Sequence, residues 1–315
     1  MSESLEAAIL PYSLLVAQDE LKLALELAYI APLIGGVLVS GQRGTAKSTA
    51  VRAFARMVYG RLPVTLPINA TDDRVVGGLD LNALMRGEAE YRPGLLEEAN
   101  ELGMLYIDEV NLLDDHIVNL ILDAASTNLL TVQRDMVGRA PVEVSFTLVG
   151  TMNPEEGSLR PQLLDRFGLM TMVSSEDDRD TRRQILETVI RFDEARHNGD
   201  ADGWLRAAVE KDAGHAEALQ AARKRLYEVD VEPVAGVCAQ VAESFGASGH
   251  RGDYVMALAA RAYAALAGKD AASVDDLREV ARMALSHRRP TGAHGATFDW
   301  TAADETRLQE ALPRG

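Results

Sequence analysis

Short apolar runs alternate with segments of helical period through the first half of the chain, and this pattern restricts the fold most. The runs cover residues 36–41, 63–69, 103–109, 144–153 and 169–174. Between them, residues 46–59 and 111–126 carry apolar side chains every three or four positions, as one face of a helix does. Strands that are apolar throughout and separated by helices predict a parallel sheet with helices on both faces. We therefore expect an α/β fold.

Two segments interrupt this alternation. Residues 77–102 are punctuated by glycines and then become helical. Residues 129–149 have the pattern of a hairpin, whose turn contains the chain-breaking residues Gly138 and Pro141. Both segments are expected as additions to the sheet.

The second half of the chain differs from the first in composition and in hydrophobic pattern. Strand-like runs stop after about Thr188, and Ala, Leu, Arg and Glu dominate residues 190–290. One helix there opens on Ser273 with an acidic residue three positions later, which is a helix-start signal. We expect an α/β domain over residues 1–188, an all-helical domain over 189–290 and a tail over 291–315.

The stretch GQRGTAKST, Gly41–Thr49, ends the first apolar run and opens the first helix. It differs by one residue from the phosphate-binding pattern Gly-x-x-x-x-Gly-Lys-[Ser/Thr], because Ala46 replaces the second glycine. A tight turn of this kind presents backbone N–H groups, and the helix N-terminus adds a positive partial charge. We expect Gly41 and Gly44 to shape the turn, and Ala46 to start the helix with a negative φ that a methyl group tolerates.

The side chains of this loop predict the chemistry. Lys47 would reach the β- and γ-phosphates of a nucleotide, and the Ser48 hydroxyl would bind Mg²⁺. Thr45 lies in the same loop, and Thr49 adds a further hydroxyl. The loop therefore predicts a nucleotide and Mg²⁺ as its ligands.

Polar residues end two later strands. Asp108 and Glu109 follow the run MLYI, and we expect them to point to opposite faces, as neighbours on a strand do. Asp108 would then support Mg²⁺, and Glu109 would act as the general base on water. Asn153 ends the run LVGTM and could orient that water, although a turn residue before Pro154 is the simpler interpretation.

Three arginines complete the candidate set. A guanidinium suits the transition state of phosphoryl transfer, and Arg160 and Arg166 both lie in the string LRPQLLDRFGL. Arg251 precedes a helix for which we expect Asp253 as the cap, and it could reach a nucleotide from there. The alternative for Arg160 and for Arg166 is a surface salt bridge.

Composition excludes other classes. The net charge is −16, which disfavours nucleic acid and anionic membranes as partners. The only cysteine, Cys238, lies in an apolar run and is expected to be buried, and the six histidines form no metal-binding cluster. No run approaches the ~20 apolar residues of a membrane helix, and no leader is evident, so a cytoplasmic location is expected.

In this order, these motifs resemble those of AAA+ ATPases. The strings GGLDLNALMRGEAEYRPGLLEEANELGMLYIDEVNLLDDHIVNLILDAAS and GTMNPEEGSLRPQLLDRFGL are similar to the ATPase subunit (subunit I) of magnesium chelatase. This resemblance implies a P-loop AAA+ core with a helix-2 insert at 77–102 and a pre-sensor hairpin at 129–149, followed by a helical lid. It implies a hexameric ring with ATP at the subunit boundaries.

The resemblance also implies roles for single residues and partners. Asn153 would be the first sensor, Arg251 the second sensor and Arg166 the finger that acts on a neighbour's nucleotide, with Arg160 as its alternative. The partners would be an integrin-domain subunit and a large subunit that inserts metal into a tetrapyrrole. The metal and the tetrapyrrole stay open, as Mg²⁺ with protoporphyrin or Co²⁺ with a corrinoid.

Other functions remain possible at this point. Ala46 is typical of MoxR-like ATPases, which favours a chaperone that matures another metalloprotein. A ring that binds nucleotide without hydrolysing it would be a scaffold, but Lys47, Glu109 and Arg166 are all present. A DNA-remodelling ATPase conflicts with the negative charge. Ala17, in VAQDE, stands where the family usually has glycine, beside the expected base pocket.

Overall fold

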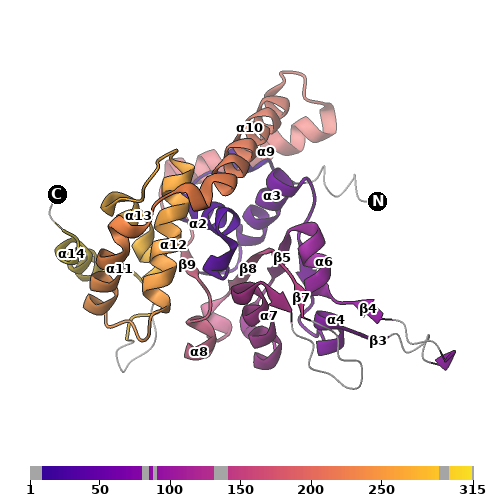
Figure 1. Cartoon of the computed structure of the whole chain (residues 1–315). Coiled ribbons are helices and arrows are strands. Elements are labelled where there is room, and N and C mark those ends of the chain that lie inside the picture. The colour runs from indigo at the N-terminus through magenta and orange to yellow at the C-terminus, as the bar shows by residue number, and fades with distance from the viewer. Residues whose placement is uncertain (1–8, 80–84, 88–90, 131–140, 291–297, 314–315) are drawn as a thin grey trace.

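Five parallel strands form the centre of the molecule in a computed structural model that describes residues 9–79, 85–87, 91–130, 141–290 and 298–313 (Figure 1). The strands are β1 (Val37–Gly41), β2 (Val64–Leu66), β5 (Met104–Ile107), β8 (Thr147–Met152) and β9 (Leu169–Val173). Their order in the sheet is β2-β5-β8-β1-β9, and every pairing is parallel. The predicted parallel sheet is therefore confirmed, and each predicted run contains one of its strands.

Helices cover both faces of the sheet because successive side chains of a strand point to opposite sides. On β1, Val37 and Val39 join a core cluster with α2 (Asp19–Ile30) and α3 (Lys47–Tyr59). Leu38, between them, joins a second cluster with α6 (Leu95–Leu102) and α7 (Asp115–Thr127). All three β1 side chains are fully buried, which explains the unbroken apolar run.

The two interrupting segments carry short antiparallel pairs. After α4 (Asp72–Val76), β3 (Gly77–Leu79) pairs with β4 (Tyr91–Pro93), and β6 (Leu129–Leu130) pairs with β7 (Val142–Glu143). The base of the predicted hairpin is confirmed, whereas its turn around Gly138 lies outside the described residues. Three short elements connect these parts: η3 (Val110–Leu112), η4 (Pro154–Glu156) and α8 (Pro161–Leu164).

The rest of the described chain is helical. It contains α9 (Arg179–Asn198), α10 (Trp204–Arg225), η5 (Leu226–Glu228), α11 (Glu232–Ser244), α12 (Arg251–Leu266), α13 (Val274–Leu285) and α14 (Ala302–Ala311). Helix α9 runs across the boundary expected at 188, so no helix ends there. Within the expected tail, Leu308 and Ala311 of α14 are buried in the same cluster as α11.

Helix starts in this region follow side-chain chemistry. Ser273 and Asp276 form a capping box at the start of α13, as predicted. The prediction of Asp253 as a cap is wrong, because α12 begins two residues earlier at Arg251 and His250 occupies the cap position. Asp253 lies instead in the first turn, where a negative charge complements the helix dipole.

Cys238 is buried as expected, and burial raises its pKa to about 12.

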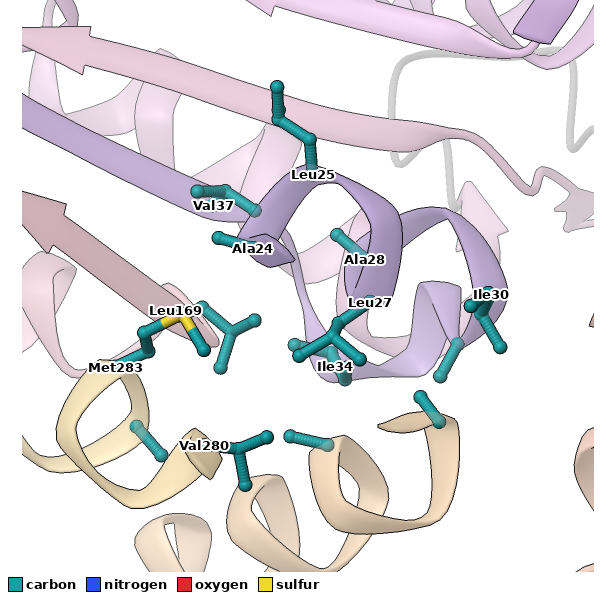
Figure 2. Close-up of a cluster of buried hydrophobic side chains, with 14 of the residues drawn as sticks. Ala24, Leu25, Leu27, Ala28, Ile30, Ile34, Val37, Leu169, Val280 and Met283 are labelled. Carbon is teal, nitrogen blue, oxygen red and sulfur yellow. The ribbon is translucent and has the colours of Figure 1, made fainter. Parts of the chain in front are cut away.

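Apolar packing joins the helical region to the core. Figure 2 shows α2 residues, among them Leu27 and Ala28, beside Val37 of β1 and Leu169 of β9. Val280 and Met283 of α13 face the same cluster from the other side. The labelled side chains of this cluster are fully or almost fully buried. The lid helices thus share one continuous core with the sheet rather than resting on its surface.

Helix α10 is fixed to the start of the chain. The Asp212 carboxylate accepts hydrogen bonds from the backbone N–H groups of Tyr12 and Ser13, both at 2.8 Å, in η1 (Tyr12–Leu14). The Glu26 carboxylate of α2 accepts from the Tyr12 hydroxyl at 2.9 Å and lies 2.8 Å from the His215 ring. These bonds anchor α10 on the core.

Among the described residues, no helix is long and apolar enough to span a bilayer.

Candidate functional site

The carboxyl ends of three adjacent strands, β1, β8 and β5, surround one cavity of about 340 Å³. It is lined by Arg43, Gly44, Thr45, Ala46, Lys47, Ser48, Thr49, Asp108, Glu109, Thr151, Met152 and Asn153. Open parallel sheets bind ligands at this edge. The structure therefore brings together three sets of predicted residues that are separated by up to about a hundred positions in the sequence.

The loop before α3 has a conformation that the sequence did not predict for Ala46. Its φ is +60° and its ψ is 19°, so the expected negative φ is wrong. Gly44 also has a positive φ, of +80°. Left-handed residues in such a loop turn successive N–H groups toward one concave side, which suits an anion. Ala46 adopts this conformation at a cost of about 1–2 kcal/mol because its Cβ crowds the following carbonyl.

Gly41 serves a different purpose from the one expected. It is the last residue of β1 and pairs with Val173 of β9. A Cβ at Gly41 would lie 2.1 Å from the Val173 carbonyl oxygen. Glycine is therefore required here by the approach of the neighbouring strand, while the turn itself depends on Gly44 and Ala46.

The start of α3 has the properties of an anion site. The helix begins at Lys47 without a side-chain cap, so its first-turn N–H groups have no partner within the helix. Lys47 Nζ donates to the carbonyl oxygens of Gly41 and Gln42, the latter at 2.7 Å. Burial lowers the Lys47 pKa, and the nearby Asp108 and Glu109 carboxylates partly oppose that shift. A polyphosphate would satisfy the amides and restore charge balance around the ammonium group.

The residues expected to bind Mg²⁺ are joined by a tyrosine that the sequence reading missed. Tyr106 Oη lies 2.9 Å from Ser48 Oγ and 2.9 Å from Asp108 Oδ1. The Thr151 hydroxyl donates to the same Asp108 oxygen at 2.7 Å. Burial raises the pKa of Tyr106 to about 12, so its hydroxyl stays protonated at neutral pH. The signal in the sequence was a tyrosine two residues before Asp108, inside an otherwise aliphatic strand.

This arrangement fits Mg²⁺ bound together with phosphate. Ser48 and Asp108 supply hard oxygen atoms, which Mg²⁺ prefers. Among the described residues, no group of three or more His, Cys, Asp or Glu side chains could hold a metal ion by itself. Magnesium sites that use one or two protein oxygens with substrate phosphates need no such cage.

Asp108 and Glu109 line the same cavity, which corrects the expectation that they point to opposite faces. The reason is that β5 ends at Ile107, and Glu109 then adopts a left-handed φ of +54°. Its N–H donates to Thr151 Oγ1 at 3.2 Å. The Glu109 carboxylate lies 3.4 Å from the Arg43 guanidinium, which also forms an ion pair with Glu156.

The position of Asn153 is compatible with both roles considered for it. It is 4% exposed, lines the cavity, and its side-chain oxygen accepts from the Glu155 N–H at 3.2 Å. The amide oxygen therefore caps η4, as a turn residue would. The amide nitrogen is a donor only, so it is the group that can serve an anionic oxygen.

A second cavity, of about 580 Å³, shares the residues Arg43, Gly44, Thr45 and Ala46 with the first. Its apolar lining includes Val16 and Leu21 on one side and Ile185, Leu186 and Val189 of α9 on the other. The residues of VAQDE, which the resemblance places beside a base pocket, line this cavity. The sequence analysis did not predict that α9 lines this cavity. The signal for it was the presence of these apolar side chains on an otherwise polar helix.

Gln18 connects the two cavities. Its side-chain nitrogen donates to the Thr45 carbonyl at 2.7 Å, while its amide oxygen is buried without a partner. Ala17 and Gln18 both have left-handed backbones, with φ of 60° and 63°. Ala17 therefore adopts the conformation that glycine would adopt more easily.

The three predicted arginines do not line either cavity. Arg160 and Arg166 form ion pairs at 2.6 Å with Asp115 and Asp123 of α7. Arg251 donates to the main-chain carbonyl of Arg166. The structure thus brings Arg166 and Arg251 together at another edge of the domain, and their roles toward a nucleotide stay predictions.

Comparison with known proteins identifies the family. Residues 36–167 match the AAA domain of the dynein-related subfamily, and residues 237–309 match the AAA lid domain. The chain is 42% identical to the magnesium-chelatase 38 kDa subunit of Rhodobacter capsulatus, over 97% of this chain and 95% of that protein. The chain belongs to the AAA+ family of magnesium-chelatase 38 kDa and ChlI subunits. The resemblance seen in the sequence is therefore confirmed.

Other members and structures agree with this family assignment. The chloroplastic magnesium-chelatase subunit ChlI of Oryza sativa is 37% identical over 89% of this chain and 76% of that protein. A cryo-EM-based complex of the magnesium-chelatase subunits BchI and BchD contains a chain that is 38% identical, with a TM-score of 0.50 over 97% of this chain and 99% of that one. A crystal structure from Cytophaga hutchinsonii is 16% identical with a TM-score of 0.63, which supports the fold alone.

One relative differs in length. The uncharacterized protein Rv2850c of Mycobacterium tuberculosis is 42% identical over 96% of this chain, but the match covers only 48% of that protein. The chain thus spans about half of that relative. Family membership implies nucleotide binding by the AAA domain, while the process that the nucleotide drives is not fixed by family alone.

Proposed function

We propose that this chain hydrolyses ATP in a Mg²⁺-dependent reaction, as a ring-forming AAA+ subunit. The observation that carries the proposal is that Lys47, Ser48, Asp108, Glu109 and Asn153 line one cavity at the start of an uncapped helix. The adjoining apolar cavity, which shares the loop, has room for the base. Together they match the two ends of a nucleoside triphosphate.

Each residue has a role that its surroundings allow. The loop amides and Lys47 hold the phosphates, and Ser48 and Asp108 hold Mg²⁺, which would neutralise developing charge on the phosphate oxygens when bound. Glu109 accepts the proton of the attacking water, and Asn153 donates to an oxygen near it. For Glu109 to act, its carboxylate must be free of the Arg43 guanidinium, 3.4 Å away.

Arg166 completes the site from a neighbouring subunit in this proposal. It lies outside the cavities of its own chain and is partly exposed. A finger of this kind contributes a factor of ~10³–10⁵ to the rate, so an isolated subunit should be nearly inactive.

Phosphate release tests the enzymatic part directly. We expect Mg²⁺-dependent release by the wild type and loss of at least ~10²-fold in Glu109→Gln, with ATP still bound in a calorimetric titration. Lys47→Ala should lose binding as well. A wild type that binds ATP but releases no phosphate, at any protein concentration, would make the chain a scaffold.

We further propose that the hydrolysis drives metal insertion into a tetrapyrrole by a partner chelatase subunit. Support comes from near full-length identity to magnesium-chelatase subunits and from the likeness to a chain in the BchI and BchD complex. An integrin-domain subunit and a large metal-inserting subunit are the proposed partners. Recovery of both with tagged chain from the native host is expected.

A second candidate is a MoxR-like chaperone for another metalloprotein. Ala46 in the phosphate loop favours it, and the likeness to the uncharacterized Rv2850c is consistent with it. Co-purification distinguishes the two candidates. An unrelated metalloenzyme as sole client, with no tetrapyrrole-binding subunit, would favour the chaperone.

A further inference from the structure

Side chains of the lid form hydrogen bonds to the main chain at Arg166 and on both sides of it. Residues 165–168 lead from α8 to β9, and each of their four carbonyl oxygens accepts a hydrogen bond from a lid side chain. Arg251 donates to the Arg166 carbonyl, and His287 Nε2 lies 3.1 Å from the Phe167 carbonyl. Arg288 makes the other contacts, over a sequence separation of more than 100 residues.

Arg288 is the centre of this contact. Its Nη2 lies 2.8 Å from the Asp165 carbonyl, its Nη1 lies 2.9 Å from the Gly168 carbonyl, and its Nε lies 3.2 Å from Asp165 Oδ1. The side chain is 1% exposed. Burial lowers the pKa of Arg288 to about 10, so the guanidinium is still charged at neutral pH.

A buried charge that bonds mainly to carbonyl groups is expensive to desolvate. The rigid guanidinium fork, however, fixes several acceptors in one geometry, which a flexible ammonium group does not. The bonds therefore hold the path of residues 165–168 more closely than apolar packing would.

The opposite side of the same segment has no free space. A Cβ at Gly168 would lie 2.1 Å from the Ile34 carbonyl, in η2 (Pro32–Ile34). A Cβ at Gly35 would lie 3.0 Å from Arg251 Nη2. Residues 165–168 are thus held between η2 and the lid, so a displacement of the lid must move them or break these bonds.

We propose that Arg288 is the positioning residue of Arg166. It binds no nucleotide; it fixes the backbone from which the Arg166 side chain extends, and it makes the orientation of that side chain depend on the position of the lid. This inference rests on the proposed function of Arg166 as a finger for a neighbouring site. Through Arg288, lid movement in one subunit would switch hydrolysis in the next.

The test compares Arg288→Met with Arg289→Met. The adjacent Arg289 is a matched control because it bonds to Asp304 and to the Phe298 and Asp299 carbonyls, and none of these lies in residues 165–168. We expect Arg288→Met to lower kcat about 100-fold, the effect of displacing a catalytic group by ~1 Å, with the Kd for ATP within twofold of wild type. Arg289→Met should keep wild-type kcat.

A double-mutant cycle tests whether Arg288 acts through Arg166. Arg288→Met should cost nothing further in the Arg166→Ala background, because there is then no finger to position. If Arg288→Met does not fold, as judged by circular dichroism, Arg288→Lys takes its place in both arms. It keeps the charge but cannot span the same carbonyls, so a smaller loss of kcat is expected.

Three results would overturn the proposal. The first is a wild-type kcat in a folded Arg288 variant, and the second is additive losses in the cycle. Either one, with the expected loss in Arg166→Ala alone, would leave the proposed function intact. The third is wild-type kcat in Arg166→Ala, which would remove the finger itself from the proposed function.

Discussion

Tyr106 Oη lies 2.9 Å from Ser48 Oγ, and this contact connects strand β5 to the first turn of α3. The same hydroxyl lies 2.9 Å from Asp108 Oδ1. The two side chains expected to bind Mg²⁺ are thus oriented by one buried phenol. In the proposed site, this contact would direct both oxygens toward one ion.

Tyr106→Phe removes only that hydroxyl. We expect the Mg²⁺ concentration for half-maximal ATPase activity to rise about 10-fold, within the range seen when a partner of a metal ligand is lost, because Asp108 and Ser48 lose a shared orienting group. Metal-free nucleotide binding should not change. Tyr59→Phe is a control, since its hydroxyl bonds to Thr147 at 2.9 Å, outside the cavity lining. An unchanged Mg²⁺ requirement in Tyr106→Phe would show that the contact is dispensable.

Ala46→Gly should stabilise the protein. Glycine relieves about 1–2 kcal/mol of left-handed strain and loses about 0.4–1 kcal/mol through the entropy of the unfolded chain, so a net gain of about 0.5–1 kcal/mol is expected. Urea denaturation without nucleotide measures the free energy of unfolding. Ala50→Gly inside α3 should instead destabilise by about 1 kcal/mol or more. Loss of stability in Ala46→Gly would contradict the conformation described for the loop.

Gly168→Ala should destabilise the molecule by about 1–3 kcal/mol, because the new methyl group would overlap the Ile34 carbonyl 2.1 Å away. Gly214→Ala is the matched substitution. Gly214 lies in α10 with nothing within 4 Å of a new Cβ, and helix propensity predicts a gain of about 1 kcal/mol. Thermal unfolding of both variants checks the difference in sign. Equal effects would argue against the close approach of Gly168 to η2.

His215 should make stability depend on pH near neutrality. Its pKa is raised above the ordinary 6.5, chiefly by the hydrogen bond to the Glu26 carboxylate. A raised folded-state pKa stabilises the protein fully below pH 6.5, and this contribution is lost as the pH rises through the folded-state pKa. The histidine is 38% exposed, so solvent screening limits the contribution to about 0.5 kcal/mol.

Urea denaturation of wild type and His215→Asn between pH 5.5 and about 8.5 measures this contribution. The advantage of the wild type should shrink as the pH rises. In a Glu26→Gln background, the difference in unfolding free energy between the histidine and asparagine variants should be smaller and should depend less on pH. A difference that grows with pH would show that the pKa is lowered rather than raised.

Much of the fold could be predicted from the sequence because burial on both faces of a sheet imposes a local pattern. Val37, Leu38 and Val39 face alternate sides, yet all are buried, so the run is apolar throughout. The capping box at Ser273 is equally local, since it depends on one side chain and the backbone three residues later. Most of the residues that line the cavity were predicted, because they end adjacent parallel strands or open the first helix, whereas Arg43, Thr151 and Met152 were not.

The predictions that were wrong concern contacts between distant segments or the backbone conformation of single residues. The positive φ of Ala46 and Glu109 follows from how the loops close around the cavity, which residue type alone does not state. Gly41 is required by β9, more than 130 positions later in the chain. The corrections for Ala46 and Glu109 concern backbone conformation, whereas Gly41, which was expected to bind the cofactor, lines neither cavity.

By itself, the sequence determined the sheet, the helical second half and the phosphate loop. Each of these features depends on a local pattern of side chains, within about ten residues of one another. Only the tertiary structure decided that Tyr106 joins Ser48 to Asp108, and that Arg288 holds the chain around Arg166. The physical reason is that hydrogen bonds of buried polar groups are satisfied by whichever partner folding brings near. That partner can lie more than 100 positions away, where no sequence period reaches.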